Sequence, residues 1–532
     1  MRIDSGPRQG ATATLVNLNP SANRWFVLRV EGGSGVAESF HLENPFPDDQ
    51  RVLLDLERRD GLVLVQGETR APCTLWPNTG DVGLATARKA RRPYVALCDE
   101  RLYLRNPSVG HRTKKEWATD ILRDRVRHGD QITNFIKEKF FRDRYLRTAK
   151  TQREAGSSQQ DAASARPLPI RTGAAARGIT LDARDLNLVV RREPGGGLKP
   201  GRWYALDGYP GVFASAITAS LVPEPTAGGR VAVLDGVEAS ATVYLVAFDL
   251  SRFELGFALG TEHPRVGWSD RVPESARVAG LPGPDGFETI APLARAGKLT
   301  PLEVERVGAT FSGGFKRSHG AFKWGTLATQ NGGSHYGFVE SGVVLSSLHP
   351  GLATLAIYDD APVVMKTWDP TDVRANLVPV HARQNGVALV EPDAQGVPRA
   401  GALVHDWGRG NWSGSQTQQL RTLRAGACLQ ENEERTFLIY AYFTSVTPPA
   451  MARVFLACEC RYAMHLDMNA PEHTYLAVYR VVGSQFVVQR LVAEMAEVDP
   501  TVDGQEVPRY VAYSDNRDFF YLLRRDEEEA SP

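Results

Sequence analysis

The sequence predicts a multidomain protein with an N-terminal all-β, sandwich-like module, a short helical segment and a C-terminal α+β domain. Three observations lead to this fold class. The chain of 532 residues is longer than one ordinary domain. Its first part consists of short apolar or alternating runs separated by turn signals. Towards the C-terminus, strand-like runs return together with one periodic helix.

The N-terminal module, residues 1–110, is expected to be a small β-sandwich. Runs such as RWFVLRVE and GLVLVQG follow one another there with almost no helical period. The module contains one histidine, His41, and no cluster of acidic residues with a partner. A binding or spacer role is therefore favoured over catalysis for this module.

Residues 111–151 are expected to form a basic amphipathic helical segment. Thr113 and Glu116 have the spacing of a capping box at its start. Its basic side chains are expected to form the solvated face of docked helices, in preference to a contact with a membrane surface or polyanion. The segment 152–178 is rich in Ala, Ser and Gln and is expected to be a flexible linker.

The remaining chain is expected to fold as one α+β domain, residues 179–525, followed by an acidic tail at 526–532. Strands are expected at VYLVAFDL, FELGFAL, GVVLSSL, TLAIYDD, APVVMKTW, TFLIYAYF and SQFVVQRLV. A helix is expected after Thr447, where two prolines open an apolar periodic run.

The composition restricts the class of partner. Lys plus Arg and Asp plus Glu both number 62, so no overall field attracts nucleic acid, and none is expected as a partner. No run approaches the roughly 18 to 20 apolar residues of a membrane span, and the N-terminus lacks a hydrophobic signal core, so the chain as given is expected to be soluble. Among the five cysteines, Cys73 and Cys98 fit either one bridge or two separate thiols.

Two glycine-containing or polar patches are candidates for a binding site. In ATFSGGFKRSHG, Gly313 and Gly314 permit a sharp turn, and Lys316 and His319 follow in the loop, where a phosphate would find amide donors and cations. A plain turn after a strand explains the same pattern. The second patch, Arg383-Gln384-Asn385, offers a guanidinium fork with amide groups, although such a triplet is also common in surface turns.

Two further patches carry the remaining polar candidates. Arg424 precedes the strand-like run AGACL and needs an anionic partner if it is buried, either a substrate phosphate or Asp467. In the strand RYAMHLDMN, alternation places His465, Asp467 and Asn469 on one face, and His473 follows in the turn. This set lacks a recognised metal-ligand spacing, so whether it binds a metal stays unknown, and no cofactor is expected.

Five blocks in this order, ATFSGGFKRSHG, HPGLATLAIYDD, RQNGVALV, RAGAC and AMHLDMN, resemble those of the phosphodiester glycosidase family. The resemblance covers about residues 243–480 and extends towards the C-terminus. It implies a mixed sheet in the α+β domain and a hydrolase that cleaves a sugar 1-phosphodiester. The residues that it places in the pocket are Lys316, His319, Arg383, Gln384, Asn385, Arg424, Asp467 and Asn469.

One position departs from the family, because Ser312 stands where the family usually has Asn before the two glycines. Asp467 is the candidate nucleophile or base, and His319 or His465 is the candidate proton carrier. The candidate groups for binding substrate or phosphate are Ser312, Gly313, Gly314, Lys316, Arg383, Gln384, Asn385, Arg424, Asn469 and His473. No second carboxylate can be identified from the sequence, so the stereochemical outcome stays open.

The expected function is therefore an exported or envelope-associated hydrolase of a phosphorylated glycan. The alternative is a glycan-binding scaffold on the same fold with weakened or lost catalysis, which Ser312 and the missing second acid favour. The sequence does not indicate an oligomeric state.

Overall fold

The computed structural model describes residues 1–117 and 151–525 with short gaps. The gaps are 5, 34–35, 78–82, 115, 154–165, 183–184, 192–196, 225–232, 263–266, 270, 285–292, 317–318, 331–332, 334, 360–361, 375–377, 409–410, 413–420, 433, 483–484 and 503–504. Most of the expected helical segment and all of the expected acidic tail lie outside the described residues.

The N-terminal module is a sandwich of two antiparallel sheets. One sheet has the order β1 (Ala11–Asn17), β2 (Trp25–Gly32), β3 (Glu38–Glu43), β8 (Leu102–Arg105) and β7 (Tyr94–Leu97). The other contains β4 (Gln50–Leu54), β5 (Gly61–Gln66) and β6 (Thr69–Thr74), and the helix α1 (Leu84–Lys89) follows. Their alternating apolar side chains share one core, in which Leu28 packs with Leu62 and Leu64. The predicted sandwich is confirmed.

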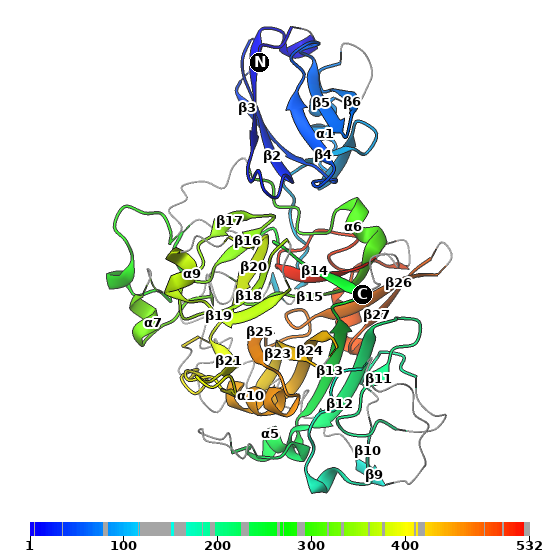
Figure 1. The fold of residues 1–532 in the computed structure, drawn as a ribbon, viewed down its shortest axis with the longest axis vertical. Coiled ribbons are helices and arrows are strands. Elements are labelled where there is room, and N and C mark those ends of the chain that lie inside the picture. The colour runs from blue at the N-terminus through cyan, green and yellow to red at the C-terminus, as the bar shows by residue number, and fades with distance from the viewer. Residues whose placement is uncertain are drawn as a thin grey trace.

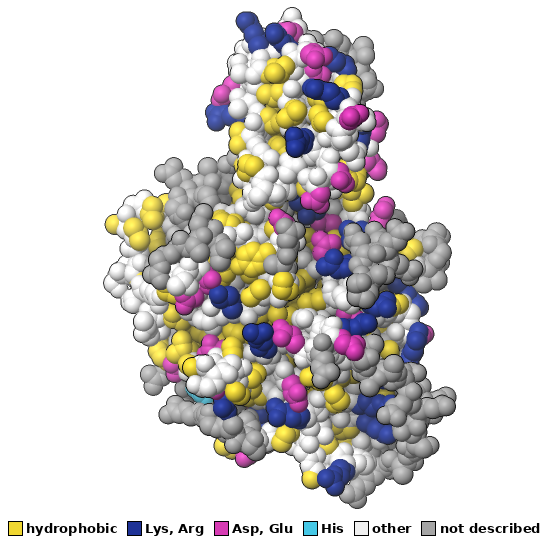
Figure 2. Space-filling view, in the orientation of Figure 1, with side chains coloured by type: hydrophobic (Ala, Val, Ile, Leu, Met, Phe, Trp, Pro, Cys, Tyr) yellow, Lys and Arg dark blue, Asp and Glu magenta, His cyan; other side chains and the backbone are white. Residues whose placement is uncertain are grey.

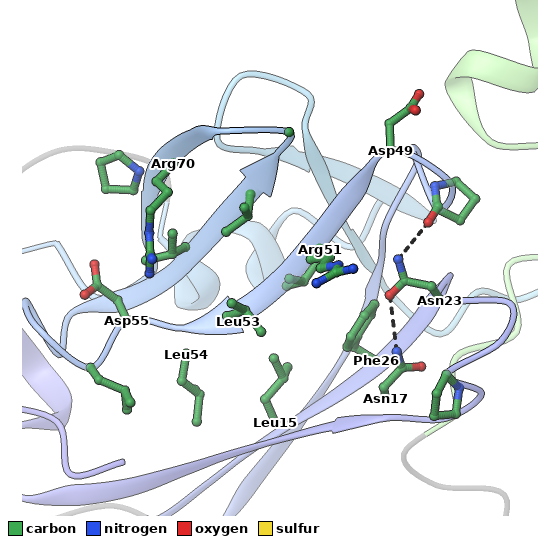
Figure 3. A pocket seen from close by; sticks show the side chains of 18 of the residues that line it. Leu15, Asn17, Asn23, Phe26, Asp49, Arg51, Leu53, Leu54, Asp55 and Arg70 are labelled. Carbon is green, nitrogen blue, oxygen red and sulfur yellow. Dashed lines mark hydrogen bonds between the residues drawn. The ribbon is translucent and has the colours of Figure 1, made fainter.

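The two sheets of this module enclose an open groove of about 1540 Å³. Figure 3 shows Leu15 and Asn17 of β1 facing Arg51 and Leu53 of β4 across it. Asn17 donates to Asn23, which shapes one end of the groove.

Three sheets form the larger body below the module (Figure 1). The largest has the order β11 (Tyr204–Ala205), β12 (Val212–Thr218), β13 (Thr242–Asp249), β24 (Thr436–Val446), β23 (Thr422–Glu431), β25 (Tyr462–Met468), β21 (Ala388–Pro392) and β22 (Pro398–Ala400). The second has the order β14 (Phe253–Ala258), β30 (Phe519–Arg524), β15 (Val307–Ser312), β26 (Leu476–Val482) and β27 (Gln485–Arg490). The third has the order β17 (Val343–Ser346), β16 (Phe338–Glu340), β20 (His381–Gln384), β18 (Ala353–Ile357) and β19 (Val364–Thr367).

One hydrophobic core joins these sheets, and the Phe311 ring of β15 lies 5.5 Å from the Tyr440 ring of β24. The helix α10 (Pro448–Ala457) begins after Thr447, as the proline pattern predicts. It packs closely on β23, where a Cβ on Gly426 would lie 2.9 Å from the Phe455 ring. The shorter helices are α5 (Gly236–Ser240), α6 (Pro301–Arg306), α7 (Thr326–Thr329) and α9 (Pro370–Arg374).

The strands that the sequence predicts for this body are confirmed, but the expected mixed sheet is not, because the strand directions differ from that expectation. Every strand pair described within the three sheets is antiparallel. Strand direction could not be read from these runs, because central strands that are buried on both faces lose the alternation typical of antiparallel sheets.

The described part of the predicted linker packs against the body. Ile170 is buried, and Leu168 and Arg171 donate backbone hydrogen bonds to Gln430 and Ala457. The strands β9 (Thr151–Arg153) and β10 (Ile179–Leu181) pair with each other on either side of this segment.

Buried ion pairs and hydrogen bonds connect the N-terminal module to the body. Arg24 Nη2 lies 2.8 Å from Glu303 Oε1, and His41 Nδ1 accepts a hydrogen bond from the amide of Ala294. Acidic and basic side chains are interspersed over the face of the whole molecule that Figure 2 shows. These contacts connect the expected spacer module directly to the domain that carries the candidate site.

The structure pairs four of the five cysteines, Cys73 with Cys98 and Cys428 with Cys460, while Cys458 is a buried thiol. Two disulfides are compatible with an oxidising compartment. Within the described residues, none of the helices has the length and apolar character needed to cross a membrane.

Candidate active site

The strand β25 brings His465 and Asp467 into the centre of the largest sheet, between β21 and β23 (Figure 1). All seven residues of this strand are buried. The polar face expected from alternation is therefore enclosed by protein, and its charged groups need partners within the fold.

Asp467 is held by two donors. Its Oδ2 forms an ion pair with Arg517 Nη1, and its Oδ1 accepts a hydrogen bond of 2.8 Å from the amide of Met468. Burial raises the pKa of Asp467 to about 6, although Arg517 and the Met468 amide act in the opposite direction. This carboxyl group therefore changes its protonation state close to neutral pH.

Arg517 connects Asp467 to a second carboxylate. Its Nη2 lies 3.4 Å from Oε1 of Glu116, which also lies 3.3 Å from Lys316 Nζ. Lys316 Nζ is 2.9 Å from Glu262 Oε2. We call Asp467, Arg517, Glu116, Lys316 and Glu262 the carboxylate–cation chain. Burial alone would raise the pKa of Glu116, but Arg517 and Lys316 outweigh it and hold that pKa well below its usual range.

Arg424 of β23 lies against His465 and not against Asp467. Its Nη1 is 3.1 Å from His465 Nε2, and its Nε donates to the carbonyl of Val446 at 2.9 Å. The Nδ1 of His465 lies 2.8 Å from the carbonyl of Leu466, so Nδ1 carries the proton and Nε2 accepts from the guanidinium. Burial and Arg424 lower the pKa of His465 to about 3. Both ring nitrogens of His465 are therefore engaged by protein groups, and its predicted role as a proton carrier stays a prediction.

Arg383 is fully buried in the third sheet, with protein groups as partners. Its Nε lies 2.6 Å from Asp518 Oδ2, and its Nη2 donates to the carbonyl of Phe315 at 2.6 Å. Gln384 accepts from the amides of Gly337 and His349 and donates to the His349 carbonyl. These partners occupy Arg383 and Gln384 within the protein, whereas the sequence patterns suggested contacts to substrate.

Asn385 forms hydrogen bonds both to the chain that follows Gly313-Gly314 and to β25. Its Oδ1 accepts from the amide of Phe315 at 3.1 Å, and its Nδ2 donates to the carbonyl of His465 at 2.7 Å. A Cβ on Gly314 would lie 2.9 Å from Asn385 Oδ1, so only glycine fits at this distance. A Cβ on Gly313 would similarly lie 2.7 Å from a carboxylate oxygen of Asp518. The two glycines permit close backbone packing beside the charged groups.

The other predicted residues lie around these contacts. Ser312 is buried, with its Oγ 3.0 Å from Tyr510 Oη. Asn469 has a left-handed backbone (φ 83°) and accepts a hydrogen bond from the Thr422 hydroxyl. His473 Nδ1 donates to the carbonyl of Met468 at 2.8 Å. His319 is half-buried, and its amide donates to the Lys316 carbonyl.

The structure thus brings Asp467 and Lys316 together through residues that the sequence analysis missed. Glu116 was assigned to a helix cap, and its amide does donate to the Thr113 hydroxyl, but its carboxylate turns to Arg517 and Lys316. Arg517 belongs to the polar run SDNRD, residues 514–518, directly before the aromatic strand β30. Such a polar run at the edge of a buried strand was the available signal.

Among the described residues, no group of three or more His, Cys, Asp or Glu side chains is arranged to bind a metal ion.

Comparison with known proteins gives remote likenesses. No family model and no curated protein matches the chain. The catalytic domain of zebrafish N-acetylglucosamine-1-phosphodiester alpha-N-acetylglucosaminidase, auto-inhibited by its pro-peptide, aligns over 67% of this chain and 95% of its own, with 10% identity and a TM-score of 0.30. A putative exported protein from Burkholderia pseudomallei aligns over 53% and 74%, with 13% identity and a TM-score of 0.20. A hypothetical protein from Synechocystis aligns over 94% and 97%, with 10% identity and a TM-score of 0.24. Similarity at this level carries no argument about function.

Proposed function

We propose that this protein is a hydrolase that cleaves glycosyl phosphodiesters at the sugar carbon, with Asp467 as the reacting carboxylate. The observation that carries the proposal is the buried Asp467, whose pKa of about 6 lets it act as a base near neutral pH, in contact with Arg517. The sequence blocks that resemble phosphodiester glycosidases meet at this point of the fold and support the choice of substrate class.

Two carboxylates with different pKa values flank Arg517. Asp467 has a raised pKa, whereas the pKa of Glu116 is lowered and Glu116 stays ionised. Pairs of titratable groups whose environments separate their pKa values are typical of acid–base sites. Glu116 is therefore the candidate for the second carboxylate that the sequence did not reveal.

The chemistry needs a base or nucleophile at the sugar and positive charge at the leaving phosphate. Asp467 in its ionised form would attack the anomeric carbon or remove a proton from the attacking water. The bond between the anomeric carbon and the phosphate oxygen breaks, and the phosphate monoester leaves with the electron pair. Lys316 and Arg517, which contact Glu116 and Asp467, would bind that phosphate after it displaces these carboxylates.

The test measures release of free sugar from glucosyl and N-acetylglucosaminyl 1-(methyl phosphate). Asp467→Asn should lower kcat by about 10² to 10⁴-fold, the usual contribution of a positioned base. The exposed Asp48→Asn is the matched control and should keep full activity. Unfolding curves should show that both variants are folded. Unchanged turnover in folded Asp467→Asn would remove Asp467 from the mechanism.

The pH dependence gives an independent readout. Because the pKa of Asp467 is raised to about 6, its ionised form increases through pH 6. The value of kcat/KM should therefore increase with pH and level off above about 7. A rate that falls through this window would show that the protonated carboxyl is the active form.

The alternative function is a glycan-binding scaffold without catalysis. One observation favours it, because Lys316 and Arg517 are already neutralised by Glu116, Glu262 and Asp467. This alternative predicts saturable binding of the same diesters without release of sugar, in the native chain and in Ser312→Asn alike. With two disulfides in the structure, we also propose that the protein acts outside the cytoplasm.

A further inference from the structure

A cleft of about 910 Å³ lies where the N-terminal module meets the body. The module contributes Arg88 and Arg91, the connecting chain contributes His111, and the body contributes Lys298 and Tyr513. This volume is within the range of about 300 to 1,000 Å³ that small-molecule sites occupy.

The charge of the cleft is one-sided. Its lining residues include two arginines, one lysine and one histidine, and none of them is Asp or Glu. Arg88 forms an ion pair with Glu38, with 3.2 Å between Nη1 and Oε1. The Arg91 side chain makes no ion pair within the described part of the chain. Positive groups without matching carboxylates attract an anion.

The ammonium group of Lys298 gives the strongest indication that the cleft binds an anion. Its Nζ donates to the carbonyl of Ala512 at 3.4 Å, which uses one of its three protons at the limit of hydrogen-bond distance. Burial lowers the pKa of Lys298, and no acidic side chain in the described residues offsets this effect. An ammonium group that is partly removed from water in this way is stabilised by an anionic ligand.

The wall of the cleft is rigidly built. The His111 amide donates to the carbonyl of Ser514 at 2.8 Å, and the His111 ring lies 5.2 Å from the Tyr513 ring. A Cβ on Gly110 would lie 2.4 Å from the amide nitrogen of Asn516, so the two chain segments are in close contact. A preformed wall reduces the ordering cost of binding.

We propose that this cleft binds a ligand bearing phosphate or sulfate groups, held between Arg91 of the module and Lys298 of the body. The proposal does not depend on the hydrolase function, because none of the carboxylate–cation chain lines the cleft. Free polyphosphate-like anions and sugars that carry several anionic groups share this chemistry, and the test distinguishes them.

The test uses calorimetric titration of the full chain with tripolyphosphate and, separately, with sucrose octasulfate. Lys298→Ala and Arg91→Ala should each raise Kd about tenfold, the usual loss for one charge-assisted hydrogen bond. Lys89→Ala and Arg92→Ala are matched controls, since both residues are exposed neighbours outside the lining, and should leave Kd within about twofold. Tighter binding of sucrose octasulfate would assign the cleft to sugar-borne groups, and tighter binding of tripolyphosphate to a free anion.

Three results would overturn the proposal. The first is absence of binding of either probe at millimolar concentration to the native chain. The second is an equal loss in the matched controls, which would indicate diffuse attraction to a basic surface. The third is loss of binding in Lys316→Met with unchanged binding in Lys298→Ala, which would place the anion in the candidate active site. Thermal unfolding of each variant verifies that it is folded.

Discussion

Asp467→Asn should change how the stability of the body depends on pH. The pKa of Asp467 is about 6 in the folded chain, against an ordinary value of 3.8. Between these values the native state binds more protons than the unfolded state, so the free energy of unfolding decreases as pH rises. Each pKa unit corresponds to about 1.4 kcal/mol, so the charged carboxylate lowers stability by about 3 kcal/mol once pH exceeds its folded pKa.

Asparagine carries no charge at any pH, so this contribution disappears in the variant. The free energy of unfolding of Asp467→Asn, relative to the native chain, should therefore rise by about 2.5 kcal/mol between pH 4 and pH 7.5. Because the protein has several domains, native-state hydrogen exchange at the amides of β23 and β25 is the appropriate measurement. Asp48→Asn is the exposed control, and its free energy of unfolding relative to the native chain should not change with pH.

The opposite outcome is informative, because two effects compete at this carboxylate. Burial disfavours the charge, whereas the ion pair with Arg517 favours it. The free energy of unfolding of Asp467→Asn relative to the native chain could instead fall as pH rises. In that case the ion pair outweighs burial, and the pKa of Asp467 lies below its ordinary value. That result would also remove the argument for Asp467 as a base near neutral pH.

Three further sets of substitutions test contacts that stabilise the body and the N-terminal module. Gly314→Ala should destabilise the protein by about 1 to 3 kcal/mol in urea unfolding, because the new Cβ would lie 2.9 Å from Asn385 Oδ1. An unchanged midpoint of urea unfolding would show that the Gly313-Gly314 turn can relax to accept the new Cβ. Gln384→Ala should cost about 2 to 4 kcal/mol in the same assay, since two buried backbone amides lose their acceptor, and a loss below 1 kcal/mol would contradict this. Replacing both Cys73 and Cys98 with Ala should lower the free energy of unfolding of the module by about 3.5 kcal/mol, the entropy of closing a loop with sequence separation 25. An unchanged free energy of unfolding would argue against the disulfide.

Local patterns were sufficient to predict the strands and the long helix of this chain, but not the partners of its charges. Alternation in RYAMHLDMN predicted one face for His465 and Asp467, but the pairing of β23 with β25 shifts register here, and alternation cannot reveal such a shift. Arg424 Nη1 contacts both His465 Nε2 and Met468 Sδ, while Asp467 pairs with Arg517. The partner of Arg383 is Asp518, 135 positions away, and no local signal joins the two. Glu116 illustrates the same limit, since its capping spacing was recognised while its side chain serves Arg517 in another part of the fold.

The shared position of Arg517 leads to a prediction about coupling between the two carboxylates. One guanidinium contacts both Asp467 and Glu116, so each carboxylate competes with the other for its charge. In Glu116→Gln, the amide oxygen can still accept from Asn516, but the competing charge is lost. Arg517 should then stabilise ionised Asp467 more strongly and lower its folded pKa from about 6 towards the ordinary value of 3.8. The decrease in exchange stability of β25 still begins near pH 3.8, but it should be smaller and end at a lower pH than in the native chain, so its midpoint moves to lower pH. If the midpoint of this decrease is the same as in the native chain, Arg517 does not couple Asp467 to Glu116. Glu116 would then serve to hold Lys316 in place and would not be a second carboxylate of the site.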